Sequence, residues 1–449
     1  MRRYLWLAVM VLVSGLLTAR GASAQGYGVY EQNACTMGRA GTAVAAPCDD
    51  GSAIFFNPAG LAKERRMVVS FGGTLVGPGG GFTNDDTGVR TDLSDVWSPV
   101  PAGYFAMPLG EKTTVGLGIF VPYGLETRWP DTFEGRFLGY KSLIQAPYIQ
   151  PTVAFKVSDT FYIGGGLDIV YTNVELERRV DLSTQQAAPG VTFAQLGIPP
   201  GTDFADVNLV GNSWGYGAHV GVLIEPSDKF SIGARYLSQV TIETDEAEFS
   251  PTQIPTGRTI PVRTPAGIRF VPVDPILAAQ FAEGGQLAEQ SAATELTHPD
   301  QFVVGVAFKV APAARILFDY QWVNWEDFDE VVITTENGLV QTLEENYDNT
   351  SGFRFGAEFD LSEKVALRGG ILAHNAGAPD ESVTPNLPEG ERVEFTVGLG
   401  AHLTENLWFD FAYQYLDQED REGRSGPLPN NGVYEFSAHL FGFGLAYRF

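Results

Sequence analysis

Histidine is the side chain that most often serves as a general base, and this chain has only five of them. A hydrolase needs its base within reach of a nucleophile on one exposed patch. The five are spread over separate segments, with no recognisable nucleophile motif beside any: His219, His298, His374, His402 and His439. We therefore expect no enzymatic activity, no cofactor and no metal site, and we interpret His219 and His402 as polar wall residues.

The other reactive side chains are two cysteines, Cys35 and Cys48, with 12 residues between them. Two thiols alone are too few for a zinc site, which takes four ligands when it is structural. In an oxidising compartment this spacing favours a disulfide, which would stabilise the loop that it closes by about 3 kcal/mol. The alternative is two free thiols.

The first residues predict export. A basic start at Arg2 and Arg3, an apolar run over residues 5–17 and the small residues 22–24 have the pattern of a secretory signal peptide. The apolar run is shorter than the roughly 20 residues that a membrane anchor needs. We expect residues 1–24 to be removed and the remainder to fold in an oxidising compartment.

The composition excludes several classes. The formal net charge is −25, and the predicted signal contains three arginines and no acid, so the mature chain is more acidic still. Nucleic acid is therefore not expected as a partner. No run of 18 apolar residues follows the signal, so membrane-spanning helices are not expected either.

Alternation with a period of two dominates the rest of the chain. In "SAHLFGFGLAYRF", residues 437–449, every second residue is large and mostly aromatic, and the residues between are mainly small or polar. Residues 391–403 and 406–418 repeat the pattern. A soluble sandwich also alternates, but it buries its apolar face. Strands of this length with an aromatic outer face indicate a transmembrane β-barrel.

The pattern predicts an all-β, antiparallel barrel of fourteen strands. Six tight turns alternate with long connections, as in outer-membrane barrels with short periplasmic turns and long external loops. We interpret the long connections as solvated loops, with contacts to divalent cations or lipopolysaccharide as the alternative. The expected strands are 67–76, 98–108, 113–121, 146–157, 160–175, 212–225, 229–242, 300–310, 313–327, 349–360, 364–376, 391–403, 406–418 and 437–449.

Residues 25–64 precede the first strand and are rich in small residues. A barrel of fourteen strands has a lumen wide enough to leave an open channel unless something fills it. We predict that residues 25–64 form a plug, or hatch, inside the barrel that residues 65–449 build.

Several motifs together resemble the FadL family of outer-membrane transporters for long-chain fatty acids and aromatic hydrocarbons. They are "GRAGTAVAA" (38–46), "DDGSAIFFNPAGLA" (49–62), "YGLETRW" (123–129), "SDTFYIGGGLDIVYTNVELER" (158–178) and "PDQF" (299–302). The resemblance covers essentially the whole mature chain. It implies a monomeric barrel in the bacterial outer membrane, with a lumenal hatch and outer-membrane lipids around it.

The function implied by the resemblance is passive uptake of hydrophobic compounds, with long-chain fatty acids as the first expectation. Neutral aromatic hydrocarbons are the alternative substrate, and a structural or adhesive barrel is the alternative of another class. External loops would capture the ligand, the lumen would bind it, and a kink in the third strand would release it sideways.

Two arginines match the positions at which the family holds a carboxylate: Arg178 in "ELERR" and Arg392 in "EGERVEF". Arginine binds carboxylates bidentately. An ion pair with a nearby acid is the equally weighted alternative for both. For outer capture we expect the aromatic residues of the loop over residues 127–140, namely Trp129, Phe133 and Phe137, which are costly at a surface unless a ligand or another loop covers them.

The motif Asn57-Pro58-Ala59-Gly60 is expected to shape the hatch. Pro58 fixes its own backbone angle and restricts Asn57, Asn57 can cap neighbouring amides, and Gly60 permits an unusual turn. An ordinary turn into the first strand is the alternative.

The third strand contains Pro122 and Gly124 in "GIFVPYGLE". Proline cannot donate to a β-ladder, and glycine tolerates unusual backbone angles. The pair predicts a kink and a gap in the wall, which the family resemblance identifies with a lateral exit. The alternative is that both residues begin the external loop.

Overall fold

The computed structural model describes residues 26–423 and 430–449, so the predicted signal peptide, residues 1–24, lies outside the described residues. Within that part of the chain, none of the helices has the length and apolar character required to cross a membrane.

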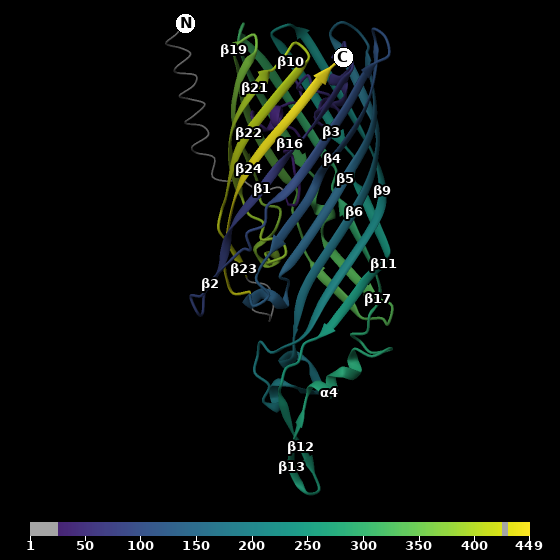
Figure 1. The fold of residues 1–449 in the computed structure, drawn as a ribbon, viewed down its shortest axis with the longest axis vertical. Coiled ribbons are helices and arrows are strands. Elements are labelled where there is room, and N and C mark those ends of the chain that lie inside the picture. The colour runs from purple at the N-terminus through teal and green to yellow at the C-terminus, as the bar shows by residue number, and fades with distance from the viewer. Residues whose placement is uncertain (1–25, 424–429) are drawn as a thin grey trace.

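The chain forms a closed antiparallel barrel of fourteen strands (Figure 1), which confirms the predicted fold class. The first strand pairs with the last from Val68↔Arg448 to Asn84↔Gly432, and this pairing closes the ring. The wall strands are β1 (Val68–Asn84), β3 (Ser98–Pro108), β4 (Thr113–Arg128), β5 (Lys141–Lys156), β6 (Phe161–Asp181), β9 (Asp203–Ser227), β10 (Phe230–Leu237) continued by β11 (Val240–Gln253), β14 (Gln290–His298) continued by β15 (Gln301–Ala311), β16 (Ala314–Val323), β19 (Thr350–Ser362), β20 (Val365–His374), β21 (Arg392–His402), β22 (Leu407–Gln418) and β24 (Gly432–Arg448).

The alternation sorts side chains between lipid and lumen. Large apolar residues such as Phe71, Phe353 and Phe443 are exposed on the outer face, whereas Ala412 and Ala446 are buried on the inner face. Without a lipid bilayer this outer surface would be far too apolar for water, and every strand finds a hydrogen-bonding neighbour around the ring. The fold therefore belongs in an outer membrane.

Several strands extend past the segments expected from sequence. Strand β6 continues to Asp181 and β9 begins at Asp203, so both rise well above the apolar band. Their outer parts mix charged and apolar residues and hide the period of two. Further short elements lie in the outer loops: β2 (Arg90–Asp92), η2 (Glu134–Phe137), η3 (Leu182–Thr184), β7 (Gln186–Ala188), β8 (Val191–Thr192), η4 (Ala194–Leu196), β12 (Thr259–Thr264), β13 (Gly267–Pro272), α4 (Asp274–Leu277), η5 (Ala278–Gln280), η6 (Trp325–Asp327), β17 (Glu330–Thr335), β18 (Val340–Glu344), η7 (Asp380–Ser382) and β23 (Arg421–Gly423).

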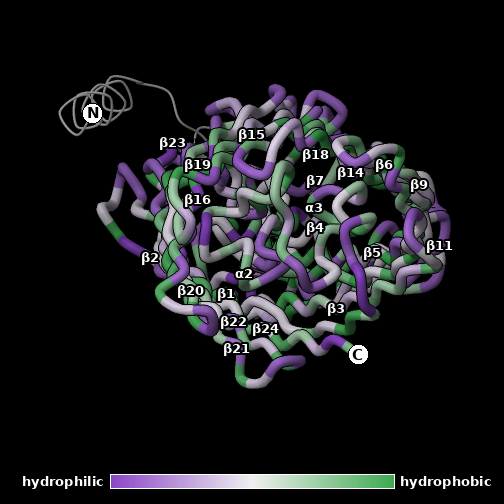
Figure 2. Tube along the Cα trace, turned by 90° about the horizontal axis from the view of Figure 1, so that it is seen from above, coloured by the Kyte–Doolittle hydropathy of each residue, from purple (hydrophilic) through white to green (hydrophobic). Residues whose placement is uncertain are grey.

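Residues 26–64, here called the N-terminal segment, lie inside the ring of strands (Figure 2). Its helix α2 (Ala34–Met37) packs on β21, β22 and β24, whereas α3 (Ala53–Phe56) and η1 (Pro58–Lys63) contact β4, β5, β6 and β9. Side-chain caps define two of these short helices, because Asn33 accepts from the Thr36 amide and Asn57 from the Ala59 amide.

Candidate functional site

The Asn57-Pro58 motif is held by the barrel wall itself. The Asn57 side-chain amide donates to the carbonyl of Val44 at 2.6 Å and to that of Val222, on β9, at 2.9 Å. Its oxygen accepts from the Ala59 amide at 3.1 Å. One side chain thus caps η1 and joins two parts of the N-terminal segment to the wall.

Three wall glycines make room for this motif. A Cβ on Gly221 would overlap Asn57, one on Gly233 would overlap the Val44 carbonyl, and one on Gly164 would meet the Pro58 backbone. Close approach of two backbones is a reason for glycine in a strand. The sequence signal for this contact was the occurrence of glycine on adjacent strands, which the motif-based reasoning did not use.

Gly60 has a different role from the one expected. Its backbone is not among the left-handed glycines, so no unusual turn requires it. A side chain at this position would instead overlap the Pro47 ring. Gly60 is therefore needed for close packing within the N-terminal segment.

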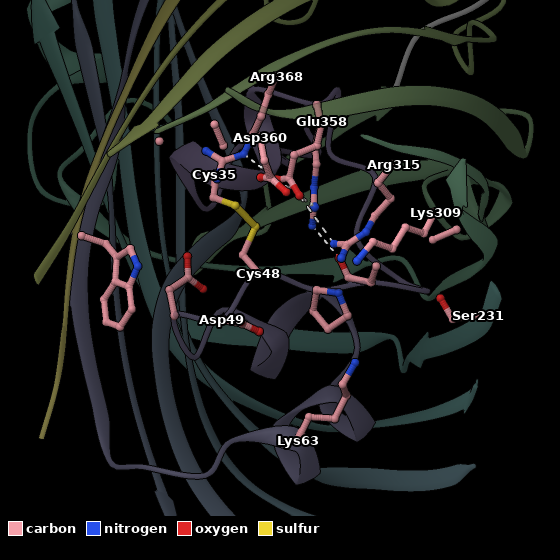
Figure 3. Close-up of a pocket in the computed structure, with 18 of the residues that line it drawn as sticks. Cys35, Cys48, Asp49, Lys63, Ser231, Lys309, Arg315, Glu358, Asp360 and Arg368 are labelled. Carbon is pink, nitrogen blue, oxygen red and sulfur yellow. Dashed lines mark hydrogen bonds and ion pairs between the residues drawn. A yellow bond between two sulfur atoms is a disulfide. The ribbon is translucent and has the colours of Figure 1, made fainter. Parts of the chain in front are cut away.

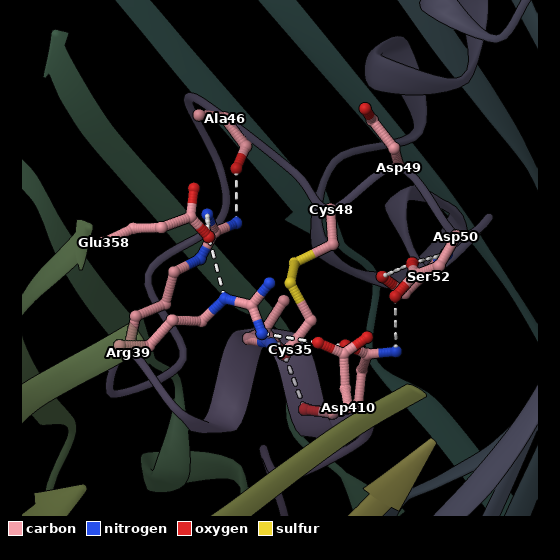
Figure 4. The surroundings of a disulfide bond; sticks show 12 residues. Cys35, Arg39, Ala46, Cys48, Asp49, Asp50, Ser52, Glu358 and Asp410 are labelled. Carbon is pink, nitrogen blue, oxygen red and sulfur yellow. Dashed lines mark hydrogen bonds and ion pairs between the residues drawn. A yellow bond between two sulfur atoms is a disulfide. The ribbon is translucent and has the colours of Figure 1, made fainter. Parts of the chain in front are cut away.

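A disulfide and buried ion pairs hold the periplasmic side of the segment (Figure 4). Cys35 and Cys48 are bonded, with a Cα–Cα distance of 6.5 Å. Arg39, 1% exposed, lies 3.6 Å from Glu358 on β19 and donates to the Ala46 carbonyl. Removing one partner of a buried ion pair leaves an uncompensated charge, so loss of Arg39 or Glu358 alone is expected to destabilise the segment.

A cavity of about 830 Å³ lies between this side of the segment and the short turns (Figure 3). Its labelled lining includes Lys63, Lys309, Arg315, Glu358 and Asp360. A cavity lined by charged side chains gives an apolar ligand no favourable surface to follow.

The wall is interrupted between β3 and β4. Their ladder runs from Pro108↔Thr114 only as far as Gly103↔Ile119, whereas β4 continues to Arg128. The pairing of β4 with β5 shifts register between Phe120 and Tyr123, around Pro122. A stretch of β4 therefore faces the side of β3 without pairing to it.

The N-terminal segment takes the place of β3 along this stretch. The Val29 amide donates to the Pro122 carbonyl at 2.8 Å, and the Gly124 amide donates to the Tyr27 carbonyl at 2.9 Å. The Gln32 side chain bonds both backbone groups of Val121, at 2.7 and 3.0 Å. Backbone groups that would be unpaired at a gap are thus satisfied from inside the barrel.

Two prolines on β3 help to keep the gap open, and the sequence reasoning missed them. Pro99 and Pro101 have no N–H, so β3 offers fewer donors with which to extend its ladder. Gly124, in contrast, is not left-handed, and a Cβ there would meet only ordinary contacts at 3.5 Å or more. The expectation that Gly124 is needed for its backbone freedom was wrong.

A closely packed cluster of aromatic rings, called the aromatic chamber below, adjoins the gap. The Tyr27 ring lies 4.8 to 5.9 Å, centre to centre, from four others, and its hydroxyl donates to the Thr297 carbonyl. Those four rings belong to Tyr123, His298, Trp325 and Phe328.

Polar atoms in and around this chamber have no hydrogen-bond partner among the described residues: Tyr148 Oη, His298 Nδ1, Trp325 Nε1 and Tyr347 Oη. Buried donors and acceptors normally find partners. The chamber therefore combines apolar ring faces with polar atoms that a ligand or water could satisfy.

Arg178 lies in an apolar groove at the outer end of the barrel. It donates to Gln341 Oε1 at 2.6 Å, and no ion pair joins it to a carboxylate within the described residues. Burial lowers the pKa of its guanidinium. The groove is lined by Leu138, Leu176, Glu177, Arg178, Val207, Leu209, Phe249, Ile333, Gln341, Leu343 and Asn386.

Arg392 has different surroundings from Arg178. It donates to the Gly26 carbonyl at 3.2 Å, while the Gly26 amide donates to Glu389 at 2.8 Å. Arg392 therefore anchors the start of the N-terminal segment, and the structure does not bring the two arginines into one site.

The three loop aromatics expected at a capture surface are buried, between 1% and 3% exposed. Trp129 stacks on Phe133 at 4.5 Å and donates to the Pro385 carbonyl, and Phe133 also contacts Phe82. Arg136 covers the Phe137 ring at 4.3 Å. Other loop and strand residues cover these rings, so Leu138, rather than Trp129, Phe133 or Phe137, reaches the groove.

One buried chain of polar groups was not foreseen. The Thr152 hydroxyl lies 2.9 Å from His219 Nε2, and His219 Nδ1 lies 2.6 Å from Asp168. All three side chains are buried in the wall, away from solvent. The expectation that the protein is not an enzyme stays a prediction.

Comparison with known proteins gives a family match over nearly the whole chain. The sequence model described as "Outer membrane protein transport protein (OMPP1/FadL/TodX)" matches residues 15–449. A 47 kDa outer membrane protein of Pasteurella multocida is 28% identical, over 98% of both chains. A long-chain fatty acid transport protein of Salmonella typhi is 24% identical, over 94% of both chains.

Solved structures share the fold. A FadL homologue from Pseudomonas aeruginosa superposes with a TM-score of 0.81 at 18% identity, over 94% of this chain and 99% of that one. The toluene transporter TbuX of Ralstonia pickettii gives a TM-score of 0.67 at 19% identity, over 94% and 100%.

Proposed function

The chain belongs to the OMPP1/FadL/TodX family of outer-membrane proteins that transport hydrophobic compounds, and on that premise we propose that its substrates are long-chain fatty acids taken up passively. The ligand binds first in the groove around Arg178, enters the aromatic chamber, and leaves sideways through the gap between β3 and β4. The unit of transport is a single barrel, because one chain forms the groove, the chamber and the gap.

The observation that carries the lateral route is the missing pairing between β3 and β4 beyond Gly103↔Ile119. In lipid an unpaired backbone group costs free energy, so every strand of a closed barrel is normally hydrogen-bonded to both of its neighbours. Here the partners of β4 come from residues 27–32, which can move without unfolding the wall. A path to the membrane thus opens by displacing a short segment.

The periplasmic route is less suited to an apolar ligand. It would require breaking the buried ion pair of Arg39 and Glu358 and crossing the charged cavity beneath it. An oily chain gains nothing from either surface.

Arg178 favours a carboxylate over a neutral hydrocarbon. A partly buried guanidinium without an acidic partner is costly, and a bound carboxylate would compensate its charge with strong hydrogen bonds. The apolar lining of the groove suits the alkyl chain.

Neutral aromatic hydrocarbons are the second candidate. The chamber around Tyr27 presents ring faces and edges that suit a flat ligand. The toluene transporter TbuX, by its name, carries such a compound on the same fold.

The test compares oleate with its neutral methyl ester on purified barrel. We expect Arg178→Met to weaken oleate binding about 10- to 100-fold, because a hydrogen bond to a charged group contributes about 1.5–3 kcal/mol. Methyl oleate should bind Arg178→Met as it binds the unchanged protein, and Arg178→Lys should retain part of the oleate affinity. Arg65→Met, an exposed arginine before β1, is the matched control. Unchanged oleate binding by Arg178→Met would refute the carboxylate site.

A further inference from the structure

A β-hairpin projects beyond the outer ends of the wall strands (Figure 1). Strands β12 and β13 pair from Thr259↔Pro272 to Thr264↔Gly267 and form a sheet of their own, without pairing to the barrel. They lie at the end opposite the short turns, and the hairpin points away from the apolar band. Nothing in the architecture of the barrel requires this extension.

The hairpin is positively charged, whereas the chain as a whole is strongly negative. It carries Arg258, Arg263 and Arg269, and the sequence contains no Asp or Glu between Phe249 and Val273. All three arginines are exposed, and their side chains form no ion pair or hydrogen bond with the described residues. In a chain with a net charge of −25, three unpaired cations on one projection form a local site for an anionic surface.

The hairpin also exposes large apolar side chains. Phe270 is 71% exposed and Ile268 is 62% exposed, and the register places both on one face with Arg263. On the opposite face Ile260 is buried against the loop cluster that contains Val273. The face of Phe270, Ile268 and Arg263 is left to water, which is costly without a partner, whereas Arg269 is exposed on the face of Ile260.

An apolar path connects the hairpin to the groove around Arg178. The loop cluster at the hairpin base, which includes Ile260, packs against Val180 and Leu287. The same two residues pack against the cluster of Val207 and its neighbours, which lines the groove. The base of the hairpin is thus joined to the proposed binding site by continuous buried apolar packing.

We propose that the β12–β13 hairpin docks the protein on the carboxylate surface of fatty-acid assemblies outside the cell, such as vesicles or mixed micelles. The arginines bind ionised carboxylates, while Phe270 and Ile268 enter the apolar layer beneath them. The hairpin points away from the membrane that holds the barrel, so the phosphates of that leaflet are not its partner. This inference rests on the proposed function and adds that the protein takes its substrate from fatty-acid assemblies.

The test is flotation of the full chain, held in phosphatidylcholine nanodiscs, with vesicles of phosphatidylcholine containing oleate at alkaline pH. The protein should float with oleate vesicles and not with pure phosphatidylcholine, and added salt should release it. Changing Arg258, Arg263 and Arg269 together to Gln should lower the partition coefficient about 100-fold, from the typical gain per basic residue near an anionic surface. Ile268→Ser with Phe270→Ser should weaken docking without changing charge.

Two controls separate docking from folding and from the proposed function. Arg65→Gln with Arg66→Gln, exposed at the other end, should leave flotation unchanged. The hairpin variants should keep heat-modifiability and their affinity for monomeric oleate, whereas Arg178→Met should lose that affinity and still float. If the carboxylate site at Arg178 is wrong, only the binding of monomeric oleate will contradict expectation, and flotation will not be affected.

Three results would overturn the proposal. They are equal flotation of the triple Gln variant and the unchanged protein, equal flotation with neutral vesicles, and tighter docking on phosphatidylglycerol vesicles of the same charge than on oleate vesicles. The last would assign the hairpin to phosphate headgroups instead.

Discussion

Replacing Tyr27 by alanine should open the wall at β4. The ring of Tyr27 is 2% exposed and contacts four other rings, and its backbone carbonyl accepts from the Gly124 amide. Truncating a buried aromatic residue to alanine typically costs about 3–5 kcal/mol. Most of that loss falls on the docking of residues 26–32, because the wall strands keep their own ladders.

The expected readout is hydrogen exchange of β4. If docking weakens by about 3–5 kcal/mol, the population of the undocked state rises by a factor on the order of 100 to 5,000. The amides of Val121 and Gly124, bonded to Gln32 and Tyr27, should exchange faster by the same factor. Peptides covering the inner half of β4, which pairs with β3, should not change.

Tyr434→Ala is the matched control. Tyr434 is also fully buried and contacts the rings of Phe82 and Trp129, but among the described residues no hydrogen bond or ring contact joins its side chain to the unpaired stretch of β4. The measurement is hydrogen exchange by mass spectrometry over residues 119–128, compared among Tyr27→Ala, Tyr434→Ala and the unchanged protein. Only Tyr27→Ala should exchange faster there. Exchange in Tyr27→Ala within threefold of that in unchanged protein would show that the segment is not held by this ring.

Three further outcomes are expected. Gly221→Ala should prevent the docking of Asn57 against the wall and raise ion conductance in planar bilayers, whereas Gly369→Ala, where a Cβ has room, should not. Reducing the Cys35–Cys48 bond should destabilise the N-terminal segment by about 3 kcal/mol and speed its proteolysis, with no effect in the double Ala variant. Burial raises the pKa of the Glu345 carboxyl from 4.5 to about 8, so the folded loop prefers the protonated form. The stability of the loop, measured by amide exchange, should therefore fall as the pH rises from 4.5 to about 8. In Glu345→Gln this fall should be absent.

The barrel was predictable because its surroundings impose a simple rule. Each strand has lipid on one face and lumen on the other, so the sequence alternates wherever the strand crosses the membrane. Each of the fourteen expected segments lies within a strand of the barrel wall or overlaps one, although several strands extend further at their outer ends. The rule ends at the membrane surface, which is why the outer parts of β6 and β9 were not recognised.

Contacts between distant segments could not be predicted in the same way. The sequence indicated that the rings of Trp129 and Phe133 must be shielded from water. It did not indicate whether a ligand or another part of the chain shields them. Likewise Arg392 had acids beside it in sequence, yet its partner is the carbonyl of Gly26, far away in the chain. Pro99 and Pro101 also signal an interrupted ladder, because neither can donate to it, but the kink was predicted from Pro122 and Gly124 alone.

Ligand binding and wall opening are joined through one residue. The Tyr27 ring fills the chamber that we propose for the substrate, and the carbonyl of Tyr27 holds the amide of Gly124 at the gap. On the proposed route, a ligand that enters the chamber displaces the Tyr27 ring, and we expect this displacement to weaken the hydrogen bond from the Gly124 amide to the Tyr27 carbonyl. In this proposal β4 loses the hydrogen bond to Tyr27 only when a ligand occupies the chamber, so the gap stays sealed against water and lipid while no substrate is present.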